Sequence, residues 1–363
     1  MKSSNFNISS FFFFYFALVA VYVIFMPKVL NDVGYNTEEI GIIFSIAPLT
    51  RFLTPFFFLK RFELNRKLFL ISSVIGVLSS LLFYFTIHSF WIFLVVNVFF
   101  GVALSLTLPF IETIAIAKLK ENYGTSRLFG SIGFMLIVLI LGEFLTNENI
   151  AIFYLIFSMI FMVIFGFLAS KEEAELKKDS NLEESKPFSI FKNLNLWISI
   201  FIMQFSFGAF YSFFVIYATE RGISLSMTSY LWTLSIIFEV LIFKYQAPIL
   251  KKYSLINIIK FAMLITSFRW FLYFSFSDNI YVYFFAQTLH AFSFALYHSA
   301  VISYLYKLYD NKKLAQQFLY GISYGLGGFL GAIVAGFLYG DYLYLYACIF
   351  TFVGFLFIAK QKY

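Results

Sequence analysis

The stretch Arg269–His298 reads RWFLYFSFSDNIYVYFFAQTLHAFSFALYH and consists of two hydrophobic segments joined at Ser277-Asp278-Asn279. The segments carry one arginine, one glutamine and two histidines in mainly apolar sequence. On an α-helix, His290 and His298 follow Gln287 at i+3 and i+11, about 300° and 20° around the axis, so the three share one stripe. Ionisable residues at bilayer depth usually face a bundle interior or a wet cavity. We therefore interpret this stripe and Arg269 as part of a working cavity, although static bridges between helices are the alternative.

The composition places the chain among membrane proteins. Hydrophobic residues make up 61% of the 363 residues and charged residues only 12%, whereas a soluble domain carries roughly 25% charged residues. At about 20 residues per span, the length allows about twelve helices. The single cysteine, Cys348, excludes an intramolecular disulfide and a cysteine metal cluster. We expect an all-α integral membrane protein with twelve transmembrane helices, with no metal or cofactor.

Hydropathy also predicts how the spans are organised. The expected spans are 8–30, 38–59, 67–87, 90–117, 128–145, 149–169, 196–218, 226–249, 255–276, 279–306, 316–339 and 341–359. The polar segment between them divides the chain into an N-terminal six-helix half (1–170), a cytoplasmic linker (171–195) and a C-terminal six-helix half (196–363). Lysine and arginine gather in one set of connections, for example at Lys60 and Arg61, and are nearly absent from the other set. By the positive-inside rule, both termini and the linker are cytoplasmic. The net charge of +7 follows from this bias and needs no nucleic-acid partner.

The two halves echo each other. Span 4 leads through Lys118–Asn122 into Gly130-Ser-Ile-Gly133, and span 10 leads through Lys307–Asn311 into Gly321-Ile-Ser-Tyr-Gly325. This indicates a duplicated six-helix unit, and two such repeats around a midplane cavity are typical of transporters. The glycine-rich span 11 has small-xxx-small spacings that let helices approach closely.

A few charges within spans carry the candidate chemistry. Unpaired charges there would be costly, so we expect them to neutralise one another or a substrate. Glu112 and Arg127 are the expected pair in the first half. Glu239, Arg269 and His290 come from three consecutive spans and could meet as a proton relay, the alternative being fixed ion pairs. The remaining charges, Arg51 and Lys244, lie toward span ends, where long side chains can snorkel.

Two motifs resemble a known family. Tyr123–Phe134 (YGTSRLFGSIGF) resembles the segment that enters span 5 in the 3-phenylpropionate permease group and in lactose permease, both of the major facilitator superfamily. Leu289–Phe294 (LHAFSF) with His298, together with Trp232 and Glu239, resembles the phenylpropionate group. The resemblance covers essentially the whole chain and implies the major facilitator fold of two six-helix halves.

The resemblance also implies site residues. It places sugar-binding positions of lactose permease on Glu112 and Arg127. It also places a span 8 glutamate on Glu239, a span 9 arginine on Arg269 and a span 10 histidine on His290. Three positions depart from that pattern: a proton-carrying carboxylate is replaced by Ser293, a lysine by Gln287, and a stacking tryptophan by Phe134. We expect substrate contacts from Glu112, Arg127, Phe134, Trp232, Glu239, Gln287 and His290. We expect proton coupling to involve Glu239, Arg269, His290 and His298.

These observations predict a secondary active transporter of the bacterial inner membrane that works as a monomer by alternating access. Proton symport of a small organic solute is favoured, with Arg127 and Arg269 binding a carboxylate and Trp232 and Phe134 stacking on a ring. The alternatives are a proton symporter for a sugar or nucleoside, or an exporter. A lipid-directed membrane enzyme would need a nucleophile or metal motif near the surface, and a sensor would usually bring a soluble domain. The sequence leaves open the substrate, the coupling ion and its stoichiometry, and the roles of Arg51 and Lys244.

Overall fold

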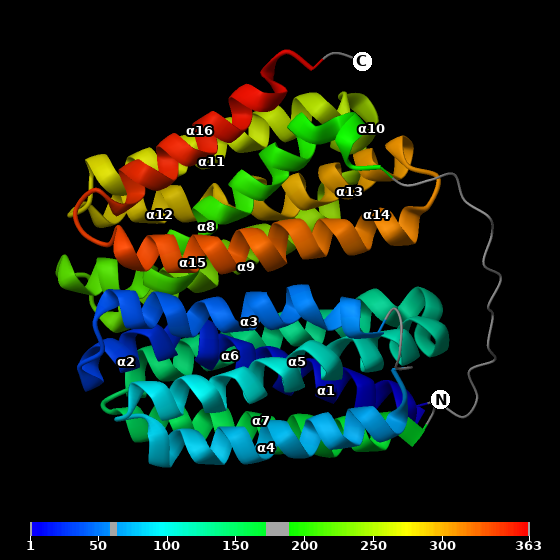
Figure 1. Cartoon of the computed structure of the whole chain (residues 1–363), viewed down its shortest axis with the longest axis vertical. Helices are drawn as coiled ribbons and strands as arrows, with labels where there is room; N and C mark the ends of the chain where they lie inside the picture. Colours follow the sequence, from blue (N-terminus) through cyan, green and yellow to red (C-terminus); the bar gives the residue numbers. More distant parts are fainter. Residues whose placement is uncertain (1, 59–63, 172–188, 362–363) are drawn as a thin grey trace. The chain divides into compact units, whose positions relative to one another are not determined.

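The computed structural model describes residues 2–58, 64–171 and 189–361. Within these residues all regular secondary structure is helical, as expected, and Figure 1 follows the helices along the chain. The chain divides into two compact units, Met1–Asn181 and Leu182–Tyr363. The basic pair at 60 and 61, and residues 172–188 of the predicted linker, lie outside the described residues, so the boundaries 1–170, 171–195 and 196–363 stay predictions.

The first unit contains seven α-helices and two short irregular helical turns among its described residues. They are α1 (Lys2–Ala20), η1 (Val21–Phe25), α2 (Met26–Val33), α3 (Thr37–Phe58), α4 (Arg66–Thr86), α5 (Phe90–Leu119), η2 (Lys120–Asn122), α6 (Tyr123–Phe144) and α7 (Glu148–Ser170). Within this unit α1 packs against α6 and α7, and α4 packs against α5.

The helices of the second unit are more often broken into short or irregular segments. Its elements are η4 (Phe191–Asn193), α8 (Leu194–Glu220), α9 (Leu225–Tyr245), α10 (Ala247–Lys252), α11 (Leu255–Ser275), α12 (Ile280–Thr288), η5 (Phe292–Leu296), α13 (Tyr297–Leu308), α14 (Lys312–Leu319), η6 (Tyr320–Gly327), α15 (Gly328–Phe337) and α16 (Leu343–Ala359). Here α8 packs against α15 and α16, and α11 packs against α16 and α13. The segments η5 and η6 are π-helical, a wider turn that often occurs at functional sites.

Each of the twelve predicted spans coincides with a helical segment of the described residues. Nine helices in this part of the chain are long and apolar enough to cross a bilayer by length and composition. Several begin where a side chain accepts a hydrogen bond from an otherwise unsatisfied backbone N–H of the first turn. Asn65 caps α4, Asn147 caps α7 and Ser224 caps α9 in this way. The helix starts are therefore set by local polar residues, and the lengths by apolar runs.

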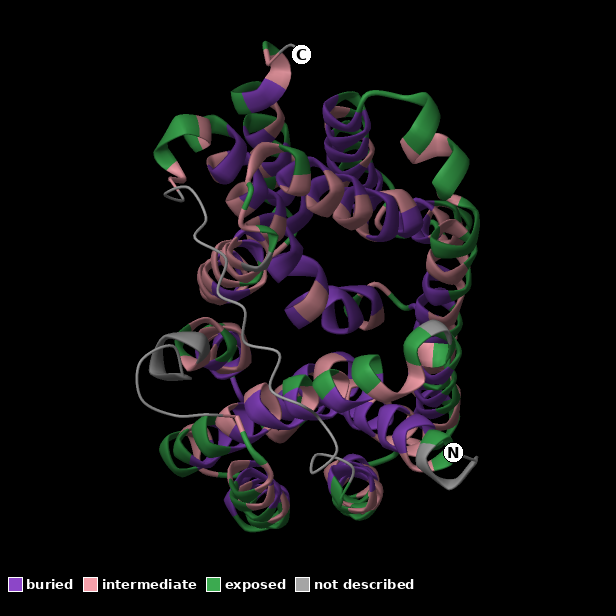
Figure 2. Ribbon diagram, turned by 90° about the vertical axis from the view of Figure 1, so that its right-hand side faces the viewer, coloured by how far each residue is buried: buried purple, intermediate pink, exposed green. Residues whose placement is uncertain are grey.

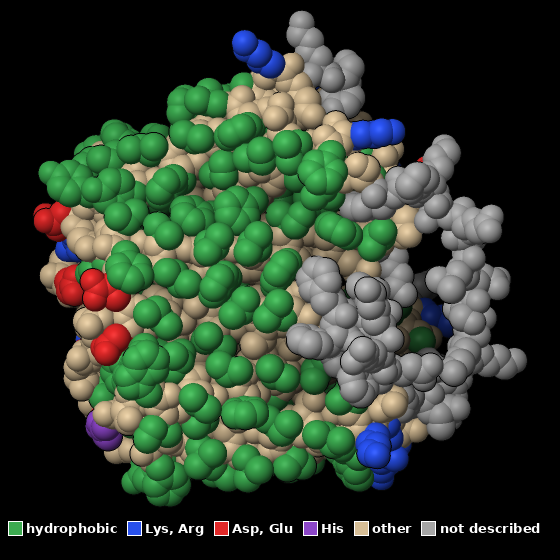
Figure 3. Space-filling view, in the orientation of Figure 1, with side chains coloured by type: hydrophobic (Ala, Val, Ile, Leu, Met, Phe, Trp, Pro, Cys, Tyr) green, Lys and Arg blue, Asp and Glu red, His purple; other side chains and the backbone are tan. Residues whose placement is uncertain are grey.

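Large apolar side chains are exposed on many helices, and α4 shows this clearly. Between the buried rings of Phe69 and Phe83, its buried face carries small residues: Ser72, Ser73, Gly76, Ser79 and Ser80. Its exposed face carries large apolar residues: Ile71, Val74, Leu78, Leu81 and Phe85. Figure 2 separates buried from exposed faces, and Figure 3 shows hydrophobic side chains spread over the surface in view. Lipid accepts the large apolar side chains, and the small ones let helices approach closely.

Glycines hold matching helix pairs together in the two units. A Cβ atom on Gly133 of α6 would lie 2.2 Å from the backbone oxygen of Phe13 on α1. A Cβ atom on Gly331 of α15 would lie 2.3 Å from the backbone oxygen of Phe205 on α8. Spans 1 and 5 therefore meet as spans 7 and 11 do. The expected duplication is visible in these contacts, but the counterpart of Gly133 is Gly331 and not the predicted Gly325.

This close approach predicts a local stability effect. Gly331→Ala is expected to lower the unfolding temperature of the purified protein, because the added methyl group must push α15 away from α8, a change of about 1–3 kcal/mol. Gly124→Ala is the matched control, since a Cβ atom there would meet nothing within 4 Å. Unfolding followed by intrinsic fluorescence would measure both variants. Equal unfolding temperatures for Gly331→Ala and the parent protein would contradict the close contact.

Candidate functional site

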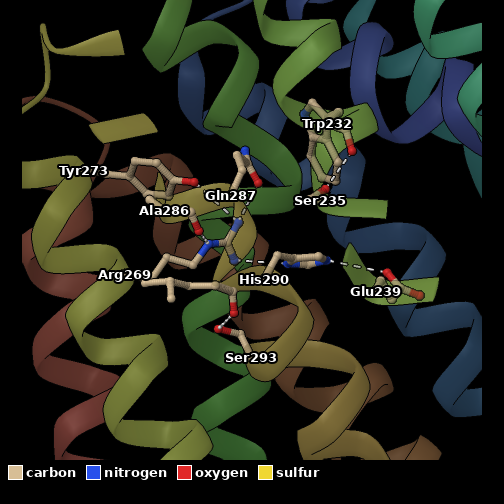
Figure 4. A network of polar contacts seen from close by, with 10 residues as sticks. Trp232, Ser235, Glu239, Arg269, Tyr273, Ala286, Gln287, His290 and Ser293 are labelled. Carbon is tan, nitrogen blue, oxygen red and sulfur yellow. Dashed lines mark hydrogen bonds and ion pairs between the residues drawn. The ribbon is translucent and has the colours of Figure 1, made fainter. Parts of the chain in front are cut away.

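The candidate site in the second unit is built around Arg269, whose side chain is fully buried on α11. Its Nε donates to the carbonyl oxygen of Ala286 at 3.0 Å. One terminal nitrogen lies 3.1 Å from Nδ1 of His290, and the other donates to Oε1 of Gln287 at 3.1 Å and to the hydroxyl of Tyr273 at 3.5 Å. Figure 4 shows these partners converging on the guanidinium. Arg269 thus ties α11 to α12 and to the residues that follow it.

The turn between the two helices brings these partners together. The side-chain oxygen of Asn279 accepts hydrogen bonds from the backbone N–H groups of Tyr281 and Val282, which starts α12 directly after the turn. The two helices therefore run back along each other, and the C-terminal part of α12 meets α11 at Arg269, in the second half of that helix. The sequence motif Ser277-Asp278-Asn279 correctly marked this hinge.

Aromatic rings surround the charge of Arg269. Its guanidinium carbon lies 4.2 Å from the ring centre of Phe210 on α8, 4.7 Å from that of Trp270 and 5.6 Å from that of Tyr273. Cations are attracted to the faces of such rings. Among the described residues, no carboxylate lies within ion-pairing distance of Arg269. The buried charge is therefore held by neutral dipoles and ring faces, whereas charges within the spans were expected to neutralise one another or a substrate.

His290 connects Arg269 to a carboxylate. Arginine has only donors, so Nδ1 of His290 must accept, and the proton of the neutral imidazole is then on Nε2. That atom lies 3.8 Å from Oε2 of Glu239 on α9. The predicted trio of Glu239, Arg269 and His290 is therefore assembled from three helical segments. Because a doubly protonated imidazole has no acceptor, His290 cannot gain a proton at Nδ1 without losing its hydrogen bond to Arg269.

His298 lies apart from this trio. The ring of Phe294 stacks on His290 at 5.7 Å and on His298 at 6.1 Å, with interplanar angles of 2° and 14°. Four residues on an α-helix add about 40° of rotation, and the wider turn of η5 cancels it. His298 forms a separate hydrogen bond, 2.7 Å from Nδ1 to the hydroxyl oxygen of Tyr324. His290 and His298 therefore lie on one side of the helix, with the ring of Phe294 between them, and they have different hydrogen-bond partners.

The first unit contains the expected pair of charges. Nε of Arg127 on α6 lies 3.4 Å from Oε1 of Glu112 on α5, and the hydroxyl of Tyr123 donates to the same oxygen at 3.4 Å. The guanidinium also lies 3.9 Å above the ring of Phe16. Both charged side chains keep about a third of their surface, 30% for Glu112 and 34% for Arg127. The pair can therefore exchange partners more easily than Arg269 can.

The remaining predicted residues differ in their burial and in their contacts. Trp232 is buried, and its ring centre lies 4.5 Å from that of Phe210. Phe134 is half-buried on α6 and makes no ring-to-ring contact with another residue in the described part of the chain. Arg51 and Lys244 are exposed, and the ammonium of Lys244 lies 5.2 Å from the ring centre of its neighbour Tyr245. The charge of Arg51 acts on the buried phenol of Tyr15, as do the charges of Glu112 and Arg127, so Arg51 lies near the first-unit pair.

Sequence reasoning missed Phe210, which contacts the rings of Trp232 and His290 as well as Arg269. The chain has 55 phenylalanines, so none of them stands out by residue type. The spacing of Phe207, Phe210 and Phe214 on one face of α8 was the available signal, but any lipid-facing stripe has the same spacing.

Known proteins resemble this chain over nearly its whole length. Residues 5–352 match the family model described as the MFS_1 like family. An uncharacterised transporter, YwbF of Bacillus subtilis (strain 168), is 26% identical, with 89% of this chain and 82% of that protein covered. A probable 3-phenylpropionic acid transporter of Escherichia coli (strain K12) is 23% identical, with 90% and 89% covered. The solved nucleoside transporter NupG has a similar fold, with a TM-score of 0.80 at 16% identity over 99% of both chains.

Proposed function

The chain belongs to the MFS_1-like family of major facilitator transporters, and on that premise we propose that it carries a small carboxylic acid together with a proton. Its relatives are transporters of bacterial membranes and not enzymes, and its helices are those of a multi-pass membrane protein. The observation that supports an acidic substrate is the fully buried Arg269, which has no carboxylate in ion-pairing distance among the described residues. A buried cation of this kind favours an anion nearby.

The charges of the cluster support coupling to a proton. With Arg269 positive, His290 neutral and Glu239 negative, the three side chains carry no net charge. A proton on Glu239 would leave the cluster with a charge of +1, and the anion of an acid would then restore neutrality. Each ligand therefore favours the other, and linkage requires the effect to be reciprocal. This is the thermodynamic basis of symport in the proposal.

The surroundings of Arg269 favour an acid that carries a ring. Trp232, Phe210 and Phe207 provide apolar faces beside the cluster, and aromatic pairs of this kind add to the gain from burial. A relative is named as a probable 3-phenylpropionic acid transporter, which agrees with this chemistry. We propose that Glu112 and Arg127 form a second contact point for the solute, because Arg127 is only partly buried. Alternating access, a monomeric state and cytoplasmic termini belong to the same proposal.

A sugar or nucleoside is the second candidate. It is supported by Glu112, which already accepts a hydrogen bond from the phenol of Tyr123 and so can accept from a solute hydroxyl in the same way. A hydroxylated solute would leave the charge of Arg269 without a matching anion, so this candidate explains less of the site.

Proton movement into proteoliposomes tests the proposal. Adding 3-phenylpropionate to lightly buffered proteoliposomes is expected to raise the external pH, since each anion enters with a proton. Protonated acid also crosses lipid unaided, so protein-free liposomes set the baseline. Uridine and lactose, added in parallel, represent the second candidate. A pH signal with uridine or lactose but none above baseline with the acid would refute the acid assignment, and labelled acid that enters without protons would refute symport.

A further inference from the structure

Among the described residues of the second unit, five buried hydrogen-bond donors have no partner. Three are the phenol hydroxyls of Tyr283, Tyr297 and Tyr344, and the other two are nitrogen donors of residues that the sequence placed in the site. These nitrogen donors are the amide nitrogen Nε2 of Gln287 and the indole nitrogen Nε1 of Trp232. Gln287 is fully buried and Trp232 is 3% exposed. Buried donors are nearly always satisfied in folded proteins, because leaving one unpaired is costly. Two such donors beside the candidate site therefore call for a ligand that supplies the acceptor.

The orientation of Gln287 follows from Arg269. Oxygen and nitrogen of a glutamine amide are assigned from their hydrogen-bond partners. Arg269 can only donate, so Oε1 of Gln287 must face it, and Nε2 must point the other way. Figure 4 shows this nitrogen on the side of the amide away from Arg269. Arg269 therefore presents the two N–H groups of Gln287 to whatever lies beyond.

Trp232 lies close to the same part of the cluster. The ring of Phe210 lies 4.5 Å from the ring of Trp232 and 4.2 Å from the guanidinium carbon of Arg269. One phenyl ring thus separates the tryptophan from the arginine that holds Gln287. Phe210 and Arg269 thus connect the indole and the amide, which belong to one cluster of side chains.

Arg269 has few free N–H groups with which it could bind a carboxylate directly. All three of its nitrogens already donate, to Ala286, to His290, and to Gln287 and Tyr273. Direct paired hydrogen bonds from Arg269 to a carboxylate, as the sequence predicted, would break this set. The geometry instead makes Arg269 a positioning residue that supplies charge, orients Gln287 and fixes the tautomer of His290.

We propose that Nε1 of Trp232 and Nε2 of Gln287 are the anchor that hydrogen-bonds the carboxylate of the transported acid. This inference rests on the proposed function and adds to it the atoms that contact the acid. Neutral N–H donors backed by a nearby cation suit a carboxylate, because they bind the anion without forming a salt bridge that must be broken for release. The anchor also gives Gln287 a role in binding an acid, at the position where the resemblance to lactose permease would place a lysine.

Binding to the purified full-length protein tests the anchor. Isothermal titration with 3-phenylpropionate is expected to show about tenfold weaker binding for Trp232→Phe and for Gln287→Leu, since each loses a hydrogen bond to a charged group. Binding of 3-phenylpropan-1-ol, which lacks the carboxylate, is expected to change less than about twofold in either variant. Trp197→Phe is the matched control, because that buried indole already donates to the hydroxyl of Tyr309 at 2.9 Å. The control should bind the acid as the parent does.

The outcomes separate the anchor from the proposed function. If the parent protein binds 3-phenylpropionate and both variants keep its affinity within about twofold, the anchor is refuted while the acid assignment stands. If the parent binds no aromatic acid, both fail. Should Gln287→Leu not fold, Gln287→Glu keeps an acceptor for Arg269 but replaces the N–H donors with oxygen, and the same loss of acid affinity is expected. Selective loss for the acid in Trp232→Phe and in one of the Gln287 variants would establish the anchor.

Discussion

Glu239→Gln is expected to abolish uphill accumulation of the acid while leaving exchange of solute across the membrane. With one proton per monovalent anion, transport is electroneutral, and a gradient of one pH unit sustains about tenfold accumulation. Without an ionisable group at position 239, that ratio should fall to about one. The reason lies in the contacts of His290, whose Nδ1 accepts from Arg269 and whose Nε2 faces Glu239 at 3.8 Å. His290 cannot take a proton at Nδ1 and keep its hydrogen bond to Arg269, so in the proposed symport we expect Glu239 to carry the proton.

Two uptake measurements in the same proteoliposomes check this result. Accumulation under an imposed pH gradient reports coupling, and counterflow of labelled acid reports transport that needs no net proton movement. Glu220→Gln is the matched control, because Glu220 accepts a hydrogen bond from Tyr339 at the end of α8, away from the cluster. Undiminished accumulation in Glu239→Gln would show that the proton binds elsewhere. Loss of counterflow together with accumulation would place Glu239 in solute binding rather than in coupling.

The parts of this protein that sequence predicts well are those governed by the bilayer. Long apolar runs must form helices in lipid, because backbone polar groups find no other partners there. Charges within the spans must find partners, so the pair of Glu112 with Arg127 could be predicted from residue type and position in the spans. The trio of Glu239, Arg269 and His290 could be predicted for the same reason. In both cases an unpaired charge within the span would cost more free energy than local differences in packing or backbone geometry.

Contacts that depend on backbone geometry could not be predicted in the same way. The π-helical segment η5 changes the register between His290 and His298, and no residue in FSFAL marks it in the sequence. Arg269 was expected to meet Glu239 and His290, yet besides His290 its partners include a backbone carbonyl and a phenol, groups that many helices offer. The echo of Gly133 was likewise assigned to Gly325, because short glycine motifs repeat several times in span 11 and only the contact with α8 identifies Gly331.

Arg269 is expected to be the residue whose loss damages the protein most. Arg269→Met removes the hydrogen bonds to the oxygens of Ala286 and Gln287 and to Nδ1 of His290. These three buried acceptors then lose the donor that Arg269 supplies. Breaking a buried charged network typically costs about 3–5 kcal/mol. We therefore expect a clear drop in the unfolding temperature and no transport of 3-phenylpropionate. Arg269→Lys keeps the charge but cannot reach all three partners from one ammonium group. It should fold better than Arg269→Met and still bind the acid weakly.

A double variant distinguishes charge from packing at this position. If Arg269 and Glu239 balance each other through His290, Arg269→Met should leave Glu239 as an uncompensated negative charge, and adding Glu239→Gln should recover part of the lost stability. Unfolding temperatures of the two single variants and the double variant form the required cycle. Strictly additive effects would mean that the two charges are independent, and the electrostatic basis proposed for coupling would fail. If the double variant regains stability but not transport, the charge of Arg269 both stabilises the cluster and attracts the anion.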